Sequence, residues 1–411
     1  MPGEVTILGA GIVGICTALS LLERGVPVRI IDRAAPGQET SFGNAGVISS
    51  FSIVPHAYPG IWRDVPGLMV GKYRPLSVRA RMWPRMIRWG AAFLRNGTEA
   101  RLRAVSDAME YLCGPSVDLY RHHLQGTGAE DVMTTSTYVQ AFRDGSKASL
   151  GTLGSRVRLE KGADMEVVGA DALHCLEPAL SRDFKAAILI KGQARARNPG
   201  RISAVLADKA RRLGAEFLAR EVRALKRAEA GWQIECQGEV IRSETVVLSM
   251  GAWSGDLLRP LGYRLPLMTE RGYHVQFADP GITVGNSVLD VEAACIASSM
   301  EQGLRFAGQA EFAPNDAPID PKRQAHLTRL AKGAFPELNT ASPTLWMGRR
   351  PSFPDSIPVL GALGEERGLF VNFGHSHHGL MMAPKSGEVL ADIVTQTTPN
   401  RDLSAFSTDR F

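Results

Sequence analysis

The sequence predicts an α/β protein with a parallel, doubly wound sheet and a second domain of α+β type. Apolar β-branched runs alternate with helix-forming runs, a pattern typical of strands joined by helices. A glycine-rich turn separates the first such strand from the first helix. The 411 residues are nearly three times the roughly 150 of an average domain, so we expect two domains.

The composition excludes several classes of protein. A hydrophobic fraction of 44% with 22% charged residues is typical of a globular chain and fits neither a disordered nor a collagen-like one. The 47 Lys and Arg exceed the 42 Asp and Glu by only five, too few to indicate nucleic acid as a partner. This excess would suit an anionic substrate or a weak contact with a membrane surface.

The cysteines indicate a reducing compartment. The five cysteines are widely spaced and form no C-x-x-C pair, so we expect neither a disulfide framework nor a metal site. Residues 5–22 carry no charge, and their length alone could pass for a membrane span or a signal peptide. The glycines within this stretch and Glu4 before it argue against both. We therefore expect a cytoplasmic protein without a cleaved leader.

The N-terminal residues predict a βαβ unit. Residues 5–8 form a short β-branched strand, residues 15–23 are rich in helix formers, and Gly25 ends the helix. Residues 26–32 form a second apolar strand. About 30 residues is the usual length of such a unit.

The turn between strand and helix has the spacing G-x-G-x-x-G, from Gly9 to Gly14. Gly9 would make the tight turn, Gly11 would let the backbone approach a pyrophosphate, and Gly14 would let the helix pack closely on the strand. Asp32 follows eighteen residues after Gly14, where a carboxylate can accept ribose hydroxyls. We therefore predict dinucleotide binding; the alternative is a glycine turn with a solvated Asp32. The expected contacts are Gly9, Gly11, Ile12, Val13, Gly14, Asp32 and Arg33.

Residues 37–59 are rich in Ser, Gly, Asn and Pro and predict a long loop, after which residues 76–95 form an amphipathic pattern with a break at Pro84. One face carries Met82, Met86, Trp89 and Phe93, and another carries Arg81, Arg85 and Arg88. We expect a helix packed on its own domain. Contact with another subunit or with a membrane surface stays open, because basic residues with Trp and Phe are also typical of interfacial helices.

The later elements follow from the same patterns. Helices are expected over 99–122, 201–213, 322–334 and 379–396. Strands are expected at 216–222, 272–278, within 288–312, at 344–350 and at 368–372, with a hairpin formed by 231–236 and 240–249.

Two further motifs favour FAD over NAD. The run Thr40-Ser41-Phe42-Gly43-Asn44-Ala45-Gly46 is small and rich in hydrogen-bonding groups, so it could wrap the pyrophosphate and reach an isoalloxazine ring. The segment from Gly374 to Gly379 leads into the last helix, whose N-terminus would stabilise the negative charge of a reduced flavin. NAD needs neither element.

These motifs together resemble those of the FAD-dependent D-amino-acid oxidase and dehydrogenase superfamily. The resemblance rests on Gly9 to Gly14, Asp32, the T-S-x-x-N-A-G run, Trp346-Met347-Gly348-Arg349-Arg350-Pro351 with Pro354, Asp355 and Pro358, and the G-H-x-x-x-G helix start. It covers essentially the whole chain. The chain is most similar to bacterial D-amino-acid dehydrogenases, with glycine and sarcosine oxidases and hydroxyproline dehydrogenases as relatives.

The resemblance implies that the substrate α-hydrogen leaves as hydride to flavin N5 and that water hydrolyses the resulting imino acid. It also implies that the Arg of the W-x-G-x-R-P motif, here Arg350, holds the substrate carboxylate. Strand parity independently places Arg350 on the face of Trp346 and Gly348, opposite Arg349. A structural salt bridge is the alternative for either arginine.

Gly272-Tyr273-His274 resembles the G-Y strand start of the family, where the tyrosine borders the substrate. A packed aromatic in the sheet wall is the alternative. Relatives often present a second tyrosine from the next strands, but residues 290–312 contain none. This departure argues against a standard small D-amino acid as the substrate.

Histidines cluster near the expected flavin. By the resemblance, His375 contacts the cofactor through its backbone. His377, His378, His274 and His56 could bind a second carboxylate or take the amine proton, because a histidine pKa lies near working pH; each is otherwise an ordinary hydrogen-bonded histidine. The catalytic candidates are Arg350, Tyr273, His377 and His56. The expected C-terminal FAD contacts are Gly374, His375, His378, Gly379 and Leu380.

The resemblance also implies the domain arrangement. A glutathione-reductase-like Rossmann domain for FAD is expected from residues 1–60, 152–255 and 340–411, capped by a mixed sheet from 61–151 and 256–339. Val222, Gly251 and Trp253 would close over the adenosine side. No cysteine follows Cys295, so the cysteine that tethers flavin in sarcosine oxidases is missing and noncovalent FAD is expected.

The favoured function is oxidative deamination of a D-amino acid, or of a cyclic relative such as D-hydroxyproline, with electrons passed to a quinone or another carrier. The first alternative is an oxidase of N-substituted glycines that uses O2. The second is an NAD-dependent dehydrogenase or a non-catalytic nucleotide-binding protein, which leaves the motifs of Arg350 and of Gly374 to Gly379 unexplained. A homo-oligomer and a peripheral contact with the inner membrane stay open.

Overall fold

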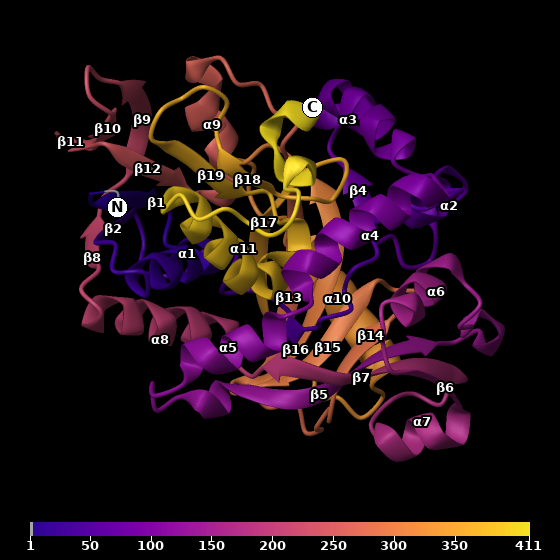
Figure 1. Cartoon of the computed structure of the whole chain (residues 1–411). Coiled ribbons are helices and arrows are strands. Elements are labelled where there is room, and N and C mark those ends of the chain that lie inside the picture. The colour runs from indigo at the N-terminus through magenta and orange to yellow at the C-terminus, as the bar shows by residue number, and fades with distance from the viewer. Residues whose placement is uncertain (1–2) are drawn as a thin grey trace.

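The structure, a computed structural model, describes residues 3–411 and is built around two large sheets (Figure 1). The first has six strands in the order β18-β19-β12-β1-β2-β8. All neighbours in it are parallel except β18, which pairs antiparallel with β19 at one edge. The strands are β1 Val5–Leu8, β2 Val28–Asp32, β8 Glu216–Ala219, β12 Thr245–Leu248, β18 Val359–Ala362 and β19 Leu369–Phe373. The predicted α/β class with a parallel sheet is confirmed.

Both faces of the parallel sheet are covered, so its central strands are apolar on both sides. Ile7 faces the cluster formed with helices α4 and α11, while Leu8 faces the cluster that includes the β9-β10-β11 hairpin sheet. Helices α1 Ile12–Leu22 and α11 Gly379–Val394 pack on this sheet, and α4 Glu99–Cys113, α5 Ser116–Leu124 and α8 Pro199–Arg212 pack against these two helices. Helix α9 Ser254–Leu258 contacts β9 of a small sheet. The small sheet consists of β9 Val222–Arg227, β10 Trp232–Cys236 and β11 Glu239–Ser243.

Helices α1 and α11 lie side by side although they come from opposite ends of the chain (Figure 1). Gly387 in α11 permits this contact, because a Cβ there would lie 2.7 Å from the backbone of Cys16 and Thr17. The close packing brings the N-termini of the two helices to the same end of the sheet.

The second sheet has ten strands and mixed direction, in the order β17-β13-β16-β15-β14-β5-β7-β3 with β4 and β6 paired beside it. Its strands are β3 Val47–Ile48, β4 Leu76–Val78, β5 Met133–Phe142, β6 Met165–Gly169, β7 Ala186–Ala196, β13 Met268–Phe277, β14 Ser287–Asp290, β15 Cys295–Met300, β16 Gly303–Phe312 and β17 Thr344–Ser352. Helices α6 Leu153–Glu160, α7 Ala170–Leu176 and α10 Lys322–Ala334 accompany it. The predicted mixed sheet is confirmed.

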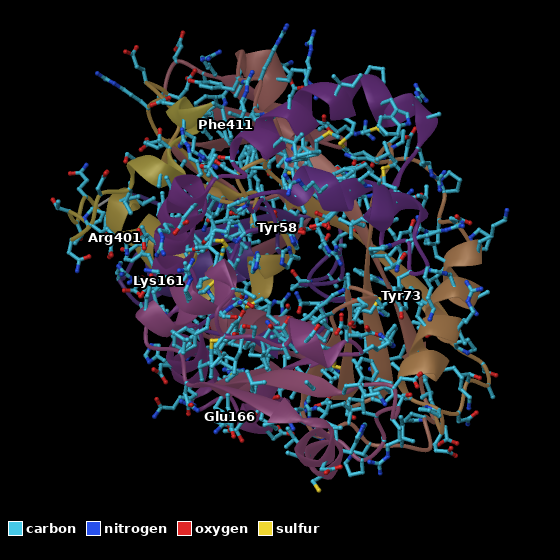
Figure 2. All side chains as sticks on the ribbon, turned by 90° about the vertical axis from the view of Figure 1, so that its right-hand side faces the viewer. Tyr58, Tyr73, Lys161, Glu166, Arg401 and Phe411 are labelled. Carbon is cyan, nitrogen blue, oxygen red and sulfur yellow. The ribbon has the colours of Figure 1, made fainter. Side chains whose placement is uncertain are left out.

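Helices α2 (Ile61–Val70) and α3 (Trp83–Arg95) lie together on one side of the molecule, which Figure 2 views directly. Met86 and Trp89 of α3 pack against Met268 and Phe312 of the second sheet. The apolar face predicted for this helix therefore contacts the protein's own core. Within residues 3–411, no helix is both long and apolar enough to cross a membrane.

The segments that form each sheet differ from the segments predicted for the two domains. Strands β6 and β7, from the segment 152–255, and β17, from 340–411, lie in the mixed sheet. Helices α4 and α5, from 61–151, pack against the helices of the parallel sheet. Strand partners distant in sequence decide these memberships, and the local pattern of each strand does not identify its partner.

Some predicted elements have different bounds. Pro84 is the second residue of α3 and begins the helix instead of breaking it, because a missing N–H costs nothing in the first turn. The pattern over 99–122 is two helices, separated at Gly114 and Pro115. The expected second hairpin strand, 240–249, is divided between β11 and the parallel strand β12. Strand β18 is an additional element that the sequence analysis missed.

Candidate active site

The glycine turn and the start of α1 form one end of a large cavity. Gly9 has a φ of 108°, and a Cβ there would lie 2.5 Å from the carbonyl oxygen of Ser249, so only glycine fits. A Cβ on Gly14 would lie 2.0 Å from the Gly9 oxygen, which is the close packing expected at this position. Gly11 is extended and leads into the helix, whose positive dipole end borders the cavity.

Asp32 ends β2 and closes the glycine turn. Its carboxylate accepts the backbone N–H of Ala10 at 2.7 Å and that of Ala34 at 2.9 Å. The side chain also lines the cavity. Asp32 can therefore hold the turn in place and still accept hydroxyl groups from a ribose.

The loop of residues 39–46 lies against the start of α1. Ser41 Oγ accepts the backbone N–H of Ile12 at 3.0 Å. Thr40 Oγ1 donates to the carbonyl oxygen of Arg349 at 2.8 Å and so ties the loop to β17. The loop thus connects the two sheets at the cavity.

The buried side chain of Arg305 holds the same loop through two hydrogen bonds. It donates to the carbonyl oxygens of Phe42 at 3.0 Å and Asn44 at 2.7 Å, and burial lowers its pKa to about 10. Trp346 covers the loop at Gly43, where a Cβ would lie 1.9 Å from the indole ring. These contacts give a segment without regular structure one defined conformation.

The residues before α11 return to the cavity. Gly374 has a φ of 93°, which favours glycine at this turn. His375 is buried with Nε2 3.2 Å from the Ser386 hydroxyl. The Tyr120 hydroxyl donates to the carbonyl oxygen of Leu380 at 2.7 Å and fixes the first turn of α11. Both α1 and α11 therefore direct their N-termini to one cavity, which favours negative charge there.

The cavity that joins these segments has a volume of about 1220 Å³. Sites for drug-sized molecules commonly have roughly 300–1,000 Å³, so this one has room for a dinucleotide and a small substrate. The predicted residues that line it are Gly9, Gly11, Ile12, Val13, Asp32, Arg33, Thr40, Ser41, Asn44, Ala45, His56, Val222, Gly251, Trp253, Tyr273, Arg350, Gly374, His375, His377, Gly379 and Leu380. The lining does not include the other three predicted residues, Gly14, Gly46 and His378.

The end of the cavity near Asp32 combines an aromatic face with positive charge. Two guanidinium groups lie over the Trp253 indole, with the Cζ atoms of Arg33 and Arg349 4.6 and 5.6 Å from its ring centre. Val222 and Gly251 line the cavity beside it. This arrangement is suited to a nucleoside and its phosphates.

Arg350 lines the other end of the cavity. Its Nη1 donates to Glu270 Oε1 at 2.6 Å and to the carbonyl oxygen of Gln309 at 3.0 Å. The Ser352 hydroxyl donates to Glu270 Oε2 at 3.2 Å. A Cβ on Gly272 would lie 2.3 Å from Nη2 and 2.5 Å from Nε, so the guanidinium rests over this glycine. The ion pair uses Nη1 only, and the Nε and Nη2 edge can still bind a carboxylate.

The strand register corrects the expectation for Tyr273. Glu270 pairs with Arg350, whereas Tyr273 pairs with Met347 and therefore lies on the other face of the sheet. The Tyr273 ring is 1% exposed in the core of the mixed sheet, and its hydroxyl donates to Glu311. The hydroxyl is not available to a substrate beside Arg350, and the residue is a packed aromatic. Arg349 lies on the same face as Tyr273 and opposite Arg350, as the alternation along the strand predicted.

Three of the predicted histidines meet beside Arg350. His56 Nε2 lies 3.2 Å from His377 Nδ1, and the His377 and His378 ring centres are 3.7 Å apart. Desolvation by the surrounding protein lowers the pKa of His56 and outweighs the opposing charge of Glu270. Burial, with the nearby His378 and His56, holds the pKa of His377 well below its usual value. Both rings are neutral at pH 7 and can accept a proton. His274 instead bonds the Gly43 carbonyl at 3.1 Å.

The buried His378 should make the free energy of unfolding of the protein depend on pH. Burial lowers its pKa in the folded protein to about 3, against an ordinary value of 6.5. Between these two pH values the imidazole is therefore protonated in the unfolded chain and neutral in the folded protein. The stability associated with the neutral, buried imidazole is fully present above pH 6.5 and is lost as the pH falls toward 3. In His378→Gln, the slope of unfolding free energy against pH should decrease by up to about 1.4 kcal/mol per pH unit in this window.

Urea unfolding of the FAD-saturated wild-type and His378→Gln proteins at pH 4.5, 5.5 and 6.5 would measure this slope. Parallel curves for the two proteins would show that the buried imidazole does not bind fewer protons in the folded state.

Glu270 is the main site residue that the sequence analysis missed. It is 8% exposed and supplies negative charge beside Arg350. The sequence offers no clear signal for it, because Glu270 stands between Thr269 and Arg271, before the strand predicted from residue 272. Its pairing with Arg350 depends on the register between β13 and β17, which the local pattern does not specify. Helices α2 and α3, which also line the cavity, were not expected there.

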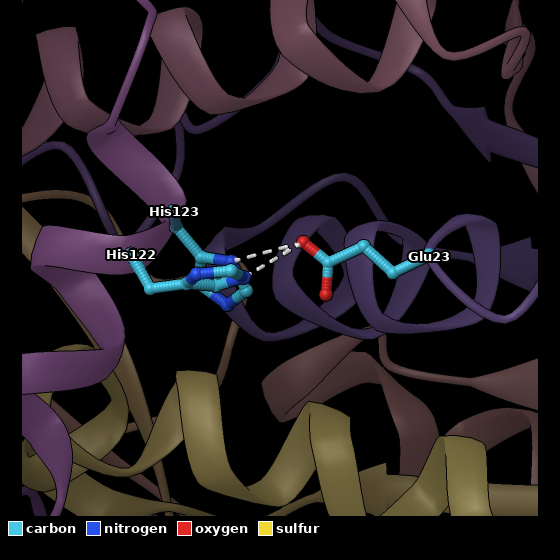
Figure 3. A group of neighbouring side chains, drawn as sticks. All are labelled: Glu23, His122 and His123. Carbon is cyan, nitrogen blue, oxygen red and sulfur yellow. Dashed lines mark hydrogen bonds and ion pairs between the residues drawn. The ribbon is translucent and has the colours of Figure 1, made fainter.

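A separate cluster of titratable side chains lies outside the cavity (Figure 3). His122 Nε2 is 3.3 Å and His123 Nδ1 3.9 Å from Glu23 Oε1, between the ends of α5 and α1. His122 is exposed, and Lys209 donates to the carbonyl oxygen of His123 at 2.9 Å. A lysine beside the cluster disfavours a bound cation, so we treat the group as a surface contact between two helices.

Comparison with known proteins identifies the family. A model of the family described as FAD dependent oxidoreductase matches residues 4–393. The chain belongs to this family. It is 32% identical over 417 residues to the D-amino-acid oxidase of Bradyrhizobium diazoefficiens, covering 99% of both chains. The resemblance found from the sequence motifs is thereby confirmed.

Solved structures share the fold of this FAD-dependent oxidoreductase. Glycine oxidase from Geobacillus kaustophilus superposes with a TM-score of 0.75 at 20% identity, covering 100% of this chain and 99% of the other. L-proline dehydrogenase from P. horikoshii has a TM-score of 0.76 at 17% identity, covering 100% and 98%. These structures agree with the two-sheet architecture described above.

The residues of the cavity fit FAD. The glycine turn has space beside it, since a Cβ on Gly11 would have the Ser41 hydroxyl as its nearest neighbour, at 3.6 Å. Among the described residues, the buried Oγ of Ser249 and Oδ1 of Asn372 lack hydrogen-bond partners, and both residues line the cavity. The FAD of this oxidoreductase can satisfy such groups, with its adenosine near Asp32 and the pyrophosphate at the N-terminus of α1.

Proposed function

We propose that the protein catalyses FAD-dependent oxidative deamination of a D-amino acid, or of a cyclic D-imino acid such as D-hydroxyproline. One observation carries this proposal: the guanidinium of Arg350 borders the cavity with its Nε and Nη2 edge unused by the ion pair to Glu270. A substrate carboxylate would bind this edge through two parallel hydrogen bonds. The 32% identity to a D-amino-acid oxidase supports the same substrate class.

Glu270 would match the other charge of the substrate. Its carboxylate lies 2.6 Å from Arg350 Nη1, so the two residues present opposite charges side by side. An amino acid carries the complementary pair, a carboxylate and an ammonium group, in the same small volume. Arg350 and Glu270 would together select a zwitterion and orient its α-carbon.

The histidine pair would hold the amine proton. FAD supplies the hydride acceptor in this chemistry, and the amine must be neutral before its α-hydrogen leaves. Neutral His56 can accept this proton, and its Nε2 lies 3.2 Å from Nδ1 of His377, whose pKa well below its usual value keeps that ring a neutral hydrogen-bond partner. The cavity-lining residues include no cysteine, in keeping with noncovalent FAD.

A second candidate is an oxidase of N-substituted glycines that uses O2. Residues 290–312 provide no tyrosine, and Ile296 and Ala307 line the cavity from that region. Such an apolar wall would also accommodate an N-alkyl group. We favour the D-amino acid because the chain is 32% identical over 99% of its length to a D-amino-acid oxidase.

Enantiomer analysis under turnover tests the proposal. Purified holoenzyme would be incubated with racemic amino acids, hydroxyproline isomers and N-alkylglycines, with a soluble quinone analogue as acceptor and an oxygen electrode in the cell. We expect loss of the D-isomers, formation of the oxo acid and little oxygen uptake. Consumption of only the N-alkylglycines, with stoichiometric oxygen uptake, would replace the proposal with the second candidate.

A further inference from the structure

Strand β16 contains a residue in an unusual backbone conformation beside Arg350. Gln309 has a φ of 64°, in the left-handed region that residues other than glycine rarely adopt. Among residues 3–411 it is the only non-glycine residue with such a φ that lies within a β-strand. Gln309 is also 3% exposed, so the packed interior maintains this conformation. An outlier of this kind points to a functional role for the residue.

The conformation belongs to a β-bulge. The register between β13 and β16 shifts between Arg271 and Tyr273. Two residues of β16, Gln309 and Ala310, therefore oppose one residue of β13, Gly272. The extra residue of a bulge is left out of the strand ladder, so its carbonyl group is available to another partner. The bulge thus frees a backbone carbonyl beside the glycine over which the guanidinium of the site rests.

Gln309 contacts two arginines that lie on opposite faces of the mixed sheet. Its backbone carbonyl oxygen accepts a hydrogen bond from Arg350 Nη1 at 3.0 Å. Its side-chain Oε1 accepts one from Nη1 of Arg323, in the first turn of α10, at 2.9 Å. The Arg323 guanidinium also lies over the ring of Tyr273, with Cζ 5.4 Å from the ring centre, and Tyr273 is on the face opposite Arg350. Gln309 therefore connects α10 with Arg350 through the sheet.

The side chain of Arg323 is held by neutral partners. Its Nη2 donates to the hydroxyl of Ser77 in β4, the strand that pairs with β16 from Ala310 onward. Within the described part of the chain, no carboxylate lies within ion-pair distance of this guanidinium, so the Gln309 amide is one of its main partners. A glycine would adopt the same φ without strain. The contact with Arg323 therefore explains why a glutamine occupies this position.

We propose that Gln309 and Arg323 are positioning residues for Arg350. Arg323 holds the Gln309 amide, the amide keeps the bulge in one conformation, and the carbonyl of the bulge fixes Nη1 of Arg350. Because Nη1 is bonded to this carbonyl and to Glu270, the Nε and Nη2 edge is left for the substrate. This inference rests on the proposed function, in which that edge binds the substrate carboxylate. Arg323 would act through Gln309 without touching the substrate.

Steady-state kinetics of the holoenzyme test this role. Gln309→Gly keeps the carbonyl and tolerates the positive φ but removes the amide, and Arg323→Ala removes the partner of that amide. Each variant should raise KM for the amino acid about tenfold while kcat changes less than twofold and FAD stays bound, because the loss of one hydrogen bond to a charged group loosens the carboxylate site. Gln309→Glu should keep KM close to that of wild type, since its carboxylate can accept the same hydrogen bond from Arg323.

Binding of a simple carboxylate separates the site from turnover. Propanoate carries only the carboxylate part of the substrate, and its binding can be followed as a change in the flavin absorbance. Its dissociation constant should rise about tenfold in Gln309→Gly and in Arg323→Ala, as KM does. Arg329→Ala is the matched control, because Arg329 is exposed in the same helix and bonds His326 at 2.9 Å. This control should match wild type in KM and in the dissociation constant.

The outcomes that would overturn the inference are distinct from those that would overturn the proposed function. An unchanged KM and an unchanged propanoate constant in Gln309→Gly and Arg323→Ala would reject the positioning role. Loss of FAD or a lower melting temperature, with an unchanged propanoate constant in the folded holoenzyme, would assign the bulge to stability and reject the role as well.

Arg350→Ala separates the two proposals. If it weakens propanoate binding and Arg323→Ala does not, the carboxylate site of the proposed function stands and only the positioning role is rejected. If Arg350→Ala leaves propanoate binding unchanged, the carboxylate binds elsewhere, and the assignment of Arg350 in the proposed function fails together with this inference.

Discussion

Replacing Arg350 by alanine should lower kcat/KM for the amino-acid substrate roughly 100- to 10,000-fold while FAD stays bound. The Nε and Nη2 edge would no longer hold the substrate carboxylate, and two charge-assisted hydrogen bonds of about 1.5–3 kcal/mol each would be lost. Most of the effect should appear in KM, because the carboxylate is bound in both the ground state and the transition state. Steady-state kinetics and the flavin absorbance of the purified variant measure the two parts.

Arg350→Lys is the conservative comparison. It keeps the positive charge without the planar pair of donors, so its kcat/KM should lie between those of wild type and Arg350→Ala. Because the alanine variant leaves Glu270 without its partner at 2.6 Å, Arg350→Ala/Glu270→Gln separates a loss of stability from a loss of binding. A KM that is unchanged in Arg350→Ala would remove this residue from the carboxylate site.

Replacing Asp32 by alanine should raise the dissociation constant of FAD about 100-fold or more. The variant loses the carboxylate that accepts the N–H groups of Ala10 and Ala34, and with it the acceptor for the ribose. Losing about 3 kcal/mol of such interactions corresponds to this change in affinity. Asp32→Ala should therefore purify largely without flavin, and calorimetric titration of the apoprotein with FAD would give the dissociation constant.

Asp32→Asn keeps the size of the side chain but removes the charge and replaces one acceptor oxygen by a donor group. Its affinity for FAD should fall between those of the other two proteins. If Asp32→Ala retained a full complement of flavin through gel filtration, the dinucleotide would have to be held without this carboxylate.

Local sequence signals were sufficient for the first βαβ unit of the parallel sheet and for several of the helices. The turn from Gly9 to Gly14 and the apolar runs on either side of it specify β1, α1 and β2 within a few residues. Helix α10, at Lys322–Ala334, has the bounds that its periodicity predicts. In such elements the residues that decide the structure are neighbours in the chain.

Partners distant in sequence could not be predicted in the same way. Strand β7 pairs with β5, β6 and β3, and its own residues do not show that it belongs to the mixed sheet instead of the parallel one. Glu270 and Tyr273 illustrate the same difficulty within the site. Which of them shares a sheet face with Arg350 follows from the register of β13 on β17.

The same distinction between local motifs and partners distant in sequence applies to the candidate site. The residues predicted to bind the cofactor occur in short motifs, and most of them line one cavity. The residues proposed to surround the substrate come from four separate segments, around His56, Glu270, Arg350 and His377. Their mutual distances depend on the packing of α1 against α11 and of β13 against β17, which only the folded chain displays.

The most direct test of the account is an anaerobic titration of the oxidised holoenzyme with single enantiomers, followed at the flavin absorbance band. One equivalent of substrate should bleach one equivalent of FAD, with a D-amino acid yielding one equivalent of oxo acid and ammonia and a cyclic D-imino acid yielding one equivalent of the cyclic imine, while the L-enantiomer should leave the band unchanged. A flavin that no amino acid of either hand bleaches would contradict the assignment of Arg350, Glu270 and the histidine pair to an amino-acid site.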